Sequence, residues 1–192
     1  MPVPYREPLW AGRCRFTNMP AQSLDDIMRE HQEAVFRLAY LMLADADDAE
    51  DVAQDTFINA YKAIDRFDAS QPMRPWLLRI CANLARNRRR SLGRYFAALR
   101  RTLLSEPEPT SVDERSVRSI DAQALWQAVR RLGTHDQEVI YLRFFLDVPE
   151  TEMAQTLNVA LGTVKSRLHR ALARLREVVR RDFPGLAQEY ET

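Results

Sequence analysis

Two sets of side chains in this sequence have the chemistry to bind nucleic acid. The first set combines one indole ring with amides and guanidinium groups on a predicted helix. A ring can stack on an unpaired base, amides can pair with base edges, and guanidinium groups can hold phosphates. At about 100° per residue, the members fall within roughly 100° of one another on one side of the helix. We call this set the arginine face, and it consists of Trp76, Arg79, Asn83, Arg86, Asn87 and Arg90.

The arginine face also has a plainer interpretation. Trp76 stands at the start of the predicted helix, where a core position explains a tryptophan as well as a base contact does. The stretch 86–101 contains arginines and no acid that could pair with them. We therefore expect the arginines, more than the ring, to mark a binding surface.

The second set lies in residues 150–181, which predict a short helix, a tight turn and a longer helix. In the longer helix Val164 and Leu168 belong to one apolar stripe, which would face the core. Asn158 in the turn tolerates a left-handed backbone, and Ala160 takes the place of the usual polar cap. This layout is typical of a helix–turn–helix DNA-binding unit, although an ordinary surface helix pair remains the alternative. We call the polar side of the longer helix the reading face: Thr163, Lys165, Ser166, Arg167, His169 and Arg170.

Acidic side chains gather on another predicted helix, from about Asp47 to Phe67. Three aspartates there are spaced at i, i+3 and i+7, which destabilises an isolated helix slightly, and a basic protein partner would relieve the repulsion. A divalent metal site and a solvated surface are the alternatives, but no glycine-turned calcium loop is present. We call this set the acidic face: Asp48, Asp51, Gln54, Asp55 and Ile58.

Composition indicates a helical protein whose charges are segregated. Few glycines among 192 residues, with many Ala, Leu and Arg, favour an all-α fold. The net charge of +1 conceals an acidic stretch at 45–55 and basic stretches at 86–101 and 165–181. Cys14 and Cys81 lie far apart without histidines at ligand spacing, so we expect neither a disulfide scaffold nor a zinc site.

The chain predicts two small helical domains joined by a flexible linker. The first, at residues 23–92, would be a three- to four-helix bundle with helices at about 24–43, 47–67 and 75–92. Residues 93–119, which include EPEPTSVDERS, have the composition of a linker.

The second domain, at residues 120–182, would contain four helices that end with the helix–turn–helix. Thr134 and Gln137 have the spacing of a capping box for its second helix. Residues 1–22 are expected to be a disordered tail, in which Met19 is an alternative start, and 183–192 a C-terminal tail.

Several classes of protein are disfavoured. No apolar run is long enough to cross a membrane, and the first residues lack the apolar core of a signal peptide, so we expect a cytoplasmic protein. There is no glycine-rich phosphate loop, no nucleophile motif and no HExxH sequence. We therefore expect no enzyme activity, no cofactor and no metal.

Three stretches together resemble the extracytoplasmic-function, or group IV, sigma factors. They are DAEDVAQDTFINAYKAIDRF at 48–67, RPWLLRICANLARNRRR at 74–90, and ETEMAQTLNVALGTVKSRLHRALARLR at 150–176. The resemblance covers about residues 24–180, with both domains in the family's order. The first two stretches form one motif block in the first domain, and the third forms another in the second domain. Two independent blocks make the resemblance far more specific than a helix–turn–helix alone.

This resemblance implies a sigma factor that binds core RNA polymerase and promoter DNA. The acidic face would dock on the clamp of the largest polymerase subunit, and the flap of the second largest is a further implied partner. The arginine face, with Phe67 and the loop that leads to Trp76, would recognise and hold open the non-template strand of the −10 element. The reading face would read the −35 element in the major groove. The family also implies control by an anti-sigma factor.

Two alternatives belong to other classes of protein. One is a conventional helix–turn–helix regulator that acts without being a polymerase subunit, and it would need a dimerisation or effector domain. The other is an interaction protein whose basic helices serve only solubility or protein binding. The acidic face beside the arginine face, within the first domain, favours the sigma factor over both.

Overall fold

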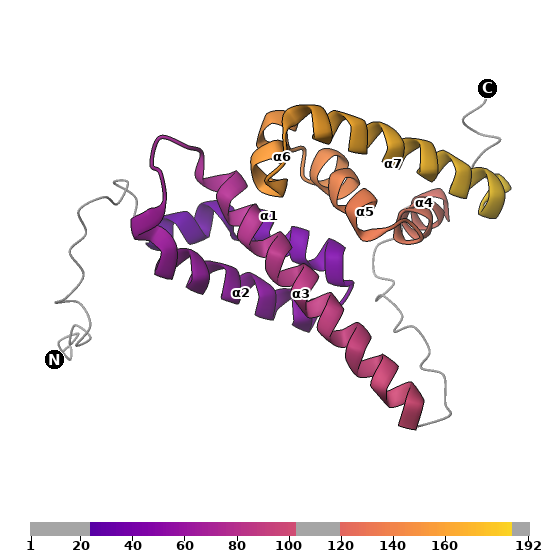
Figure 1. The fold of residues 1–192 in the computed structure, drawn as a ribbon, viewed down its shortest axis with the longest axis horizontal. Helices are drawn as coiled ribbons and strands as arrows, with labels where there is room; N and C mark the ends of the chain where they lie inside the picture. Colours follow the sequence, from indigo (N-terminus) through magenta and orange to yellow (C-terminus); the bar gives the residue numbers. More distant parts are fainter. Residues whose placement is uncertain (1–23, 103–119, 186–192) are drawn as a thin grey trace, which may run out of the picture.

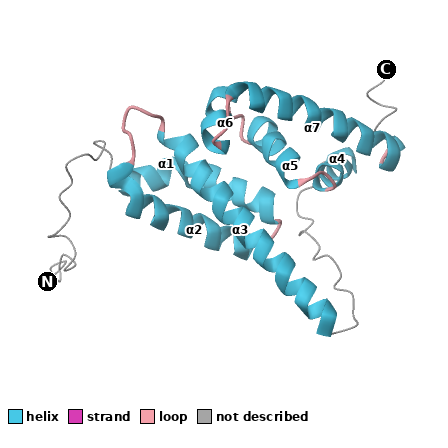
Figure 2. Ribbon diagram, viewed as in Figure 1, coloured by secondary structure: helices cyan, strands magenta, loops and turns pink. Residues whose placement is uncertain are grey.

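The computed structural model describes residues 24–102 and 120–185, and every regular element in these ranges is a helix (Figures 1 and 2). The predicted all-α fold is therefore confirmed. The predicted N-terminal tail, residues 103–119 of the predicted linker and most of the predicted C-terminal tail lie outside the described residues. The elements are α1 (Leu24–Leu43), α2 (Ala46–Ala63), η1 (Ile64–Arg66), α3 (Met73–Thr102), α4 (Ile120–Arg130), α5 (Thr134–Ile140), η2 (Tyr141–Phe145), α6 (Glu150–Leu157) and α7 (Leu161–Asp182).

The first domain is a bundle in which α1, α2 and α3 all pack against one another. The chain reverses between α1 and α2 at Ala44, whose φ of 58° is left-handed. The carboxylate of Asp45 then caps α2 by accepting a hydrogen bond from the backbone N–H of Asp48 at 2.8 Å. Apolar side chains at helical spacing, such as Val52 and Leu77, fill the centre of the bundle. This bundle orients both the acidic face on α2 and the arginine face on α3.

The helix α3 is longer than the sequence predicts. It begins at Met73, so Pro75 lies in its first turn, where proline is well tolerated. We predicted an end near Leu92, but α3 continues through Gly93 to Thr102, so that prediction was wrong. One glycine costs a helix only about 1 kcal/mol, and the residues that follow it are mostly good helix formers. Figure 1 shows the end of α3 projecting beyond α1 and α2.

The second domain arranges α4 to α7 around a cluster of three aromatic rings. The ring of Tyr141 lies 5.6 Å from that of Trp126 and 5.7 Å from that of Phe145, measured between centroids. The predicted capping box is wrong, because Gly133 caps α5 without a side-chain hydrogen bond. The amide of Gln137 instead donates to two carbonyl oxygens at the end of α4, at 2.8 and 2.9 Å. Gln137 therefore satisfies backbone carbonyl groups at the end of the preceding helix that have no partner within that helix.

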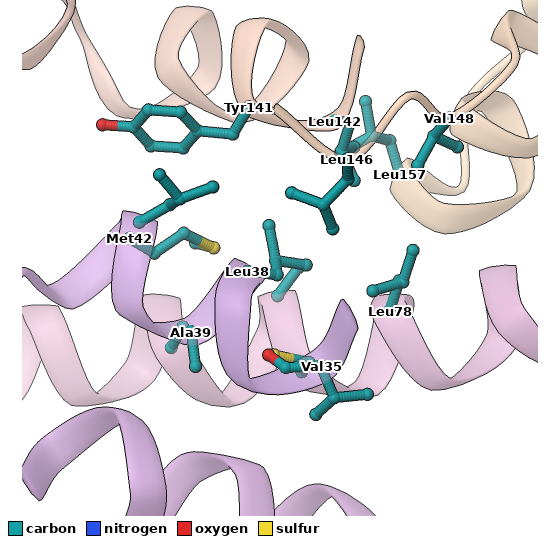
Figure 3. Close-up of a cluster of buried hydrophobic side chains, with 14 of the residues drawn as sticks. Val35, Leu38, Ala39, Met42, Leu78, Tyr141, Leu142, Leu146, Val148 and Leu157 are labelled. Carbon is teal, nitrogen blue, oxygen red and sulfur yellow. The ribbon is translucent and has the colours of Figure 1, made fainter. Parts of the chain in front are cut away.

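The two domains share one continuous apolar core. Leu38 and Met42 of α1 and Leu78 of α3 face Tyr141 and Leu146 of the second domain (Figure 3). Leu38 and Leu78 are fully buried by this arrangement. The sequence predicted two domains but not this contact between them.

Two hydrogen bonds reinforce the apolar contact. The guanidinium of Arg74 donates to the carbonyl oxygen of Leu146 at 2.7 Å. The hydroxyl of Thr156 on α6 lies 3.4 Å from the carbonyl oxygen of Pro75, which belongs to the first turn of α3. The start of α3 is thus held against η2 and α6, and the helix–turn–helix lies beside the first domain.

The buried hydroxyl of Tyr141 offers a test of the second domain's packing. Within the described residues this hydroxyl has no hydrogen-bond partner, and the side chain is 1% exposed. Burial raises the pKa of Tyr141 to about 12, so the phenol stays neutral. An unpaired buried hydroxyl costs about 1–3 kcal/mol.

We therefore predict that Tyr141→Phe leaves the free energy of unfolding in urea unchanged or raises it by about 1 kcal/mol. Tyr141→Leu is the control, and it should lower the value because the contacts with the rings of Trp126 and Phe145 are lost. A loss of more than about 1 kcal/mol in Tyr141→Phe would mean that the hydroxyl is paired.

Candidate nucleic-acid interface

The turn between α6 and α7 has the geometry that the sequence predicts. Asn158 adopts a left-handed conformation with φ of 53°, and its backbone N–H bonds to the carbonyl of Gln155 at 3.2 Å. The next N–H, of Val159, closes the turn on Ala154 at 3.0 Å. Such a left-handed residue ends a helix sharply, and asparagine accepts this conformation better than most side chains do. The turn fixes the direction in which α7 leaves α6.

The helix α7 has one buried side and one exposed side. Val164 and Ala171 are fully buried, and Leu168 and Leu175 pack against the core. These residues belong to the predicted apolar stripe, which is confirmed. Asp182, the last residue of α7, pairs with Arg131, which directly follows α4.

The reading face lies mostly in solvent. Lys165, Ser166, His169 and Arg170 are exposed, whereas Thr163 and Arg167 are half-buried. The Ser166 hydroxyl donates to the carbonyl of Thr163 at 3.1 Å, and the Arg170 guanidinium donates to the carbonyl of Ser166 at 3.1 Å. Both bonds stay within α7, and among the described residues no ion pair joins the reading face to another helix. A basic, exposed helix side of this kind suits the major groove of DNA.

Most of the arginine face is also exposed, on α3. Arg79, Asn83, Asn87 and Arg90 are all in solvent. The guanidinium of Arg86 is hydrogen-bonded to the side-chain oxygen of Asn83 and, at 3.2 Å, to the carbonyl of Ala82. The structure therefore brings together four exposed members of the predicted face and leaves Arg86 at its edge.

Arg86 has an acidic partner that the sequence did not predict. We expected the arginine row to lack acidic partners, but the Arg86 Nε atom lies 3.5 Å from the Oε1 atom of Glu138 on α5. The side chain of Glu138 is only 3% exposed. Next to this ion pair, Arg89 donates to the amide oxygen of Gln137 at 2.8 Å. One edge of the arginine face is thus already occupied by the second domain.

Phe67 and Trp76 form an aromatic pair at the base of the arginine face. Their ring centroids lie 4.7 Å apart, and Phe67 is 8% exposed. Trp76 is half-buried and packs against the core. The core explanation for Trp76 thus has support, while its exposed part remains next to Arg79. The aromatic contact fixes the loop between η1 and α3, since the two rings flank that loop.

The acidic face lies along α2. Asp51, Gln54, Asp55 and Ile58 are exposed, and Ile58 is 48% exposed, which is unusual for an isoleucine. Asp48 is less accessible because Arg88 of α3 donates to its carboxylate.

Arg88 ties the acidic face to α3. Its guanidinium also lies 3.7 Å from the carboxylate of Asp51. Asp48 raises the pKa of Arg88 through a hydrogen bond and its charge. A groove beside this pair is lined by residues of both helices, among them Gln54, Asp55 and Asn87. The acidic face therefore borders the arginine face instead of standing apart from it.

Sequence reasoning missed the residues that connect the two domains. The sequence indicated no role for Glu138 and placed Gln137 in a capping box. Arg88 and Arg89 lie in an arginine run whose members cannot be told apart without a structure. The one available signal was that an acid within an apolar stretch, QEVIYL at 137–142, would be buried and need a partner.

Two further observations concern metal-binding proteins and membrane proteins, two classes that the sequence disfavoured. Among residues 24–102 and 120–185, no three His, Cys, Asp or Glu side chains come close enough to hold a metal ion. In the same part of the chain, no helix combines the length and apolarity that a membrane span requires.

Two family descriptions match the chain, and each corresponds to one helical domain. Residues 27–95 match sigma-70 region 2, and residues 122–175 match sigma-70 region 4. The first match contains the acidic and arginine faces, and the second contains the reading face. Together they define a sigma factor of the sigma-70 type.

Two relatives indicate which family of sigma factors the chain belongs to. SigW of Bacillus subtilis, an extracytoplasmic-function RNA polymerase sigma factor, is 32% identical over 81% of this chain and 88% of its own. SigL of Mycobacterium tuberculosis, from the same family, is 32% identical over 77% of this chain and 83% of its own. The chain belongs to the extracytoplasmic-function RNA polymerase sigma factors, a family of transcription factors and not of enzymes.

Two solved structures are similar to this one. RpoE of Bartonella quintana, in complex with the anti-sigma factor NepR, has a TM-score of 0.67 and 26% identity. The similarity covers 82% of this chain and 97% of that one. CnrH in complex with the cytosolic domain of CnrY has a TM-score of 0.60 and 25% identity over 83% and 88% of the two chains. Each similarity covers more of the chain than a single domain contains, so both extend across the two domains.

The missing cap of α7 leads to a prediction about stability. Ala160 occupies the N-cap position with φ of −64° and ψ of 148° and offers no side-chain acceptor. We predict that Ala160→Ser raises the free energy of unfolding by about 1 kcal/mol, because its hydroxyl would accept from an unpaired N–H of the first turn. Urea unfolding measures the change, with Ala160→Val as the control, because valine accepts the same extended backbone and offers no hydrogen-bond acceptor. A serine variant no more stable than the valine variant would contradict the prediction.

Proposed function

We propose that this chain binds core RNA polymerase through the acidic face and directs it to promoters through the arginine and reading faces. The observation that supports the proposal most is the arrangement of these faces. Each is exposed over most of its predicted members, and each lies in the domain whose family match corresponds to it. One chain thus presents one surface for a protein and two surfaces for DNA.

The arginine face would hold the non-template strand of the −10 element. Asn83 and Asn87 are exposed amides that could pair with base edges, and Arg79 and Arg90 flank them to neutralise phosphates. The half-buried ring of Trp76, backed by Phe67, would supply a rigid surface against a base. Binding of unpaired bases stabilises the melted state, so this face would assist strand opening.

The reading face would read the −35 element as double-stranded DNA. Lys165, His169 and Arg170 project from one side of α7, and the opposite side is anchored in the core. Lysine and arginine hydrogen-bond the guanine edge in the major groove, so we expect specificity for guanines within this element. The rigid turn at Asn158 would hold α7 at a fixed angle to the groove.

The acidic face would contact a basic surface on the clamp of the largest polymerase subunit. Asp51 and Asp55 supply the charge, and the exposed Ile58 supplies apolar area next to them. Interfaces of this kind gain specificity from complementary charge and affinity from buried apolar side chains. The second domain would contact the flap of the second largest subunit, and the chain would act in the cytoplasm, where the polymerase is.

An anti-sigma factor is the further partner that we propose. In the two similar structures, RpoE is bound to the anti-sigma factor NepR and CnrH is bound to the cytosolic domain of CnrY. A conventional helix–turn–helix regulator is not favoured, because the first domain matches sigma-70 region 2.

Charge reversal on α2 tests the proposed contact with polymerase. We predict that the double variant Asp51→Lys and Asp55→Lys weakens binding to core polymerase about tenfold or more, equivalent to ~1.4 kcal/mol. Fluorescence anisotropy with purified core measures the affinity. The double variant Glu33→Lys and Glu177→Lys serves as the control because it changes the charge equally, and both residues are exposed on helices other than α2. Equal losses in both variants would show that net charge, and not this face, governs binding.

A second substitution tests the reading face. We predict that Arg170→Ala lowers output from a −35-dependent promoter about tenfold, because a base contact contributes about 1–3 kcal/mol. In vitro transcription with core polymerase, from the promoter upstream of the chain's own gene, gives the measurement. Arg176→Ala is the matched control, as Arg176 is exposed further along α7 and does not belong to the reading face. Unchanged output in Arg170→Ala would reject the assignment.

A further inference from the structure

His169 differs from the other two histidines of the chain in its surroundings. His31 is 8% exposed, and burial lowers its pKa, which favours the neutral ring. His135 has a carboxylate beside it, since its Nδ1 atom lies 3.5 Å from Glu138. His169 is exposed on α7, and among the described residues no hydrogen bond or ion pair involves its ring. This imidazole is therefore available to a ligand.

The position of His169 on α7 places it toward one edge of the reading face. Val164 and Leu168 face the core, so the middle of the opposite side of the helix lies at Ser166. At about 100° per residue, His169 lies roughly 60° from Ser166, in the direction of Lys165. It also lies about 6 Å beyond Lys165 along the helix axis. Lys165 and His169 therefore form one edge of the reading face.

An α-helix in the major groove meets two kinds of group. The middle of its outer side faces the base edges, and its two edges face the phosphates that border the groove. Ser166 would thus point to the bases, while Lys165 and His169 would lie beside the phosphates of one strand. A phosphate oxygen accepts a hydrogen bond from an imidazole N–H, and its negative charge favours the charged ring.

The helix α7 itself places no carboxylate next to His169. Its nearest charged neighbours on this helix, Lys165 and Arg170, are both cations. The first acid that follows is Glu177, about 12 Å further along the helix axis. The two cations oppose a further positive charge on the ring in the free chain. Bound DNA would reverse this balance.

The helices that pack against α7 do not supply an anion either. Four carboxylates belong to α5 and α6: Asp136, Glu138, Glu150 and Glu152. Asp136 and Glu138 each face an arginine, and within the described residues none of the four forms an ion pair with His169. The charged side chain described in α4, Arg130, is a cation. A DNA phosphate would therefore be the first anion that this ring meets.

We propose that His169 couples binding of the −35 duplex to the uptake of one proton. This inference rests on the function proposed for the reading face. As a phosphate approaches, the ring accepts a proton from solvent on its free nitrogen and donates an N–H to a phosphate oxygen. No covalent bond other than this N–H is made or broken. The charged ring holds DNA more tightly than the neutral ring, so the affinity rises as the pH falls from about 8 to about 6, the range in which histidine gains its charge.

One added charge predicts the size of two effects. At about 4 Å in water, the attraction of two unit charges corresponds to roughly fivefold in affinity. Each phosphate that a protein neutralises adds about 0.9 to the slope of log affinity against log salt concentration. We therefore expect binding about fivefold tighter near pH 6 than near pH 8, and a salt dependence steeper by about 0.9 near pH 6.

The measurement uses the full chain assembled with core RNA polymerase. The probe is a fluorescent duplex that carries the −35 part of the promoter upstream of the chain's own gene. It lacks the −10 element, so strand opening does not contribute to the affinity. Fluorescence anisotropy gives the affinity at pH 6, 7 and 8, each at several salt concentrations.

Two substitutions of His169 should remove the pH dependence in opposite ways. His169→Gln cannot become charged, so it should bind at every pH as weakly as the parent does at pH 8. His169→Arg is always charged, so it should bind at every pH as tightly as the parent does at pH 6, with the same steep salt dependence. The control His135→Gln removes an exposed histidine outside the reading face, and it should keep the parent's pH dependence. Comparing variants at each pH cancels the titration of the polymerase.

The outcomes separate this inference from the proposed function. A His169→Gln variant that keeps the parent's pH dependence would overturn the inference, as would a parent whose affinity is equal at pH 6 and pH 8. A pH dependence without a change in the salt slope would overturn the contact with phosphate. Arg170→Ala reports on the proposed function, because it should weaken binding at every pH. If Arg170→Ala has no effect, the role proposed for the reading face fails; if it weakens binding while His169→Gln behaves as the parent does, only the inference fails.

Discussion

The apolar contact between α1, α3 and η2 is the interaction on which the whole arrangement depends. Without it Leu38 and Leu78 would lose their cover, and the second domain would have no fixed position relative to the first. The polar contacts at its edge, such as that of Arg74 with the Leu146 carbonyl, satisfy groups that the apolar contact buries. The position of the helix–turn–helix relative to the arginine face thus follows from packing, and the ion pairs adjust to it.

Arginine is the other recurrent element, because its planar group can exchange one anionic partner for another. Arg88 bridges the acidic and arginine faces, and Arg86 and Arg89 bridge the two domains. Each of these partners is a carboxylate or an amide oxygen, the same chemistry that DNA offers as phosphates and base edges. The same arginine row can therefore bind either protein carboxylates or DNA phosphates, with no change in its own position on α3.

Much of the fold could be predicted from the sequence, because its signals are local. The period of the apolar residues located the helices, and Asn158 marked the turn of the helix–turn–helix. The exposed sides of α3 and α7 followed from the same periodicity, and the family resemblance agrees with the matches to regions 2 and 4. The end of α3 was missed because one glycine was given too much weight against strong helix formers.

The contact between the domains could not be predicted, because no local pattern distinguishes it. Leu38 and Leu142 have the spacing of ordinary core residues within their own helices, and nothing in that spacing names a second layer. The burial of Glu138 likewise depends on a partner about fifty positions away in sequence.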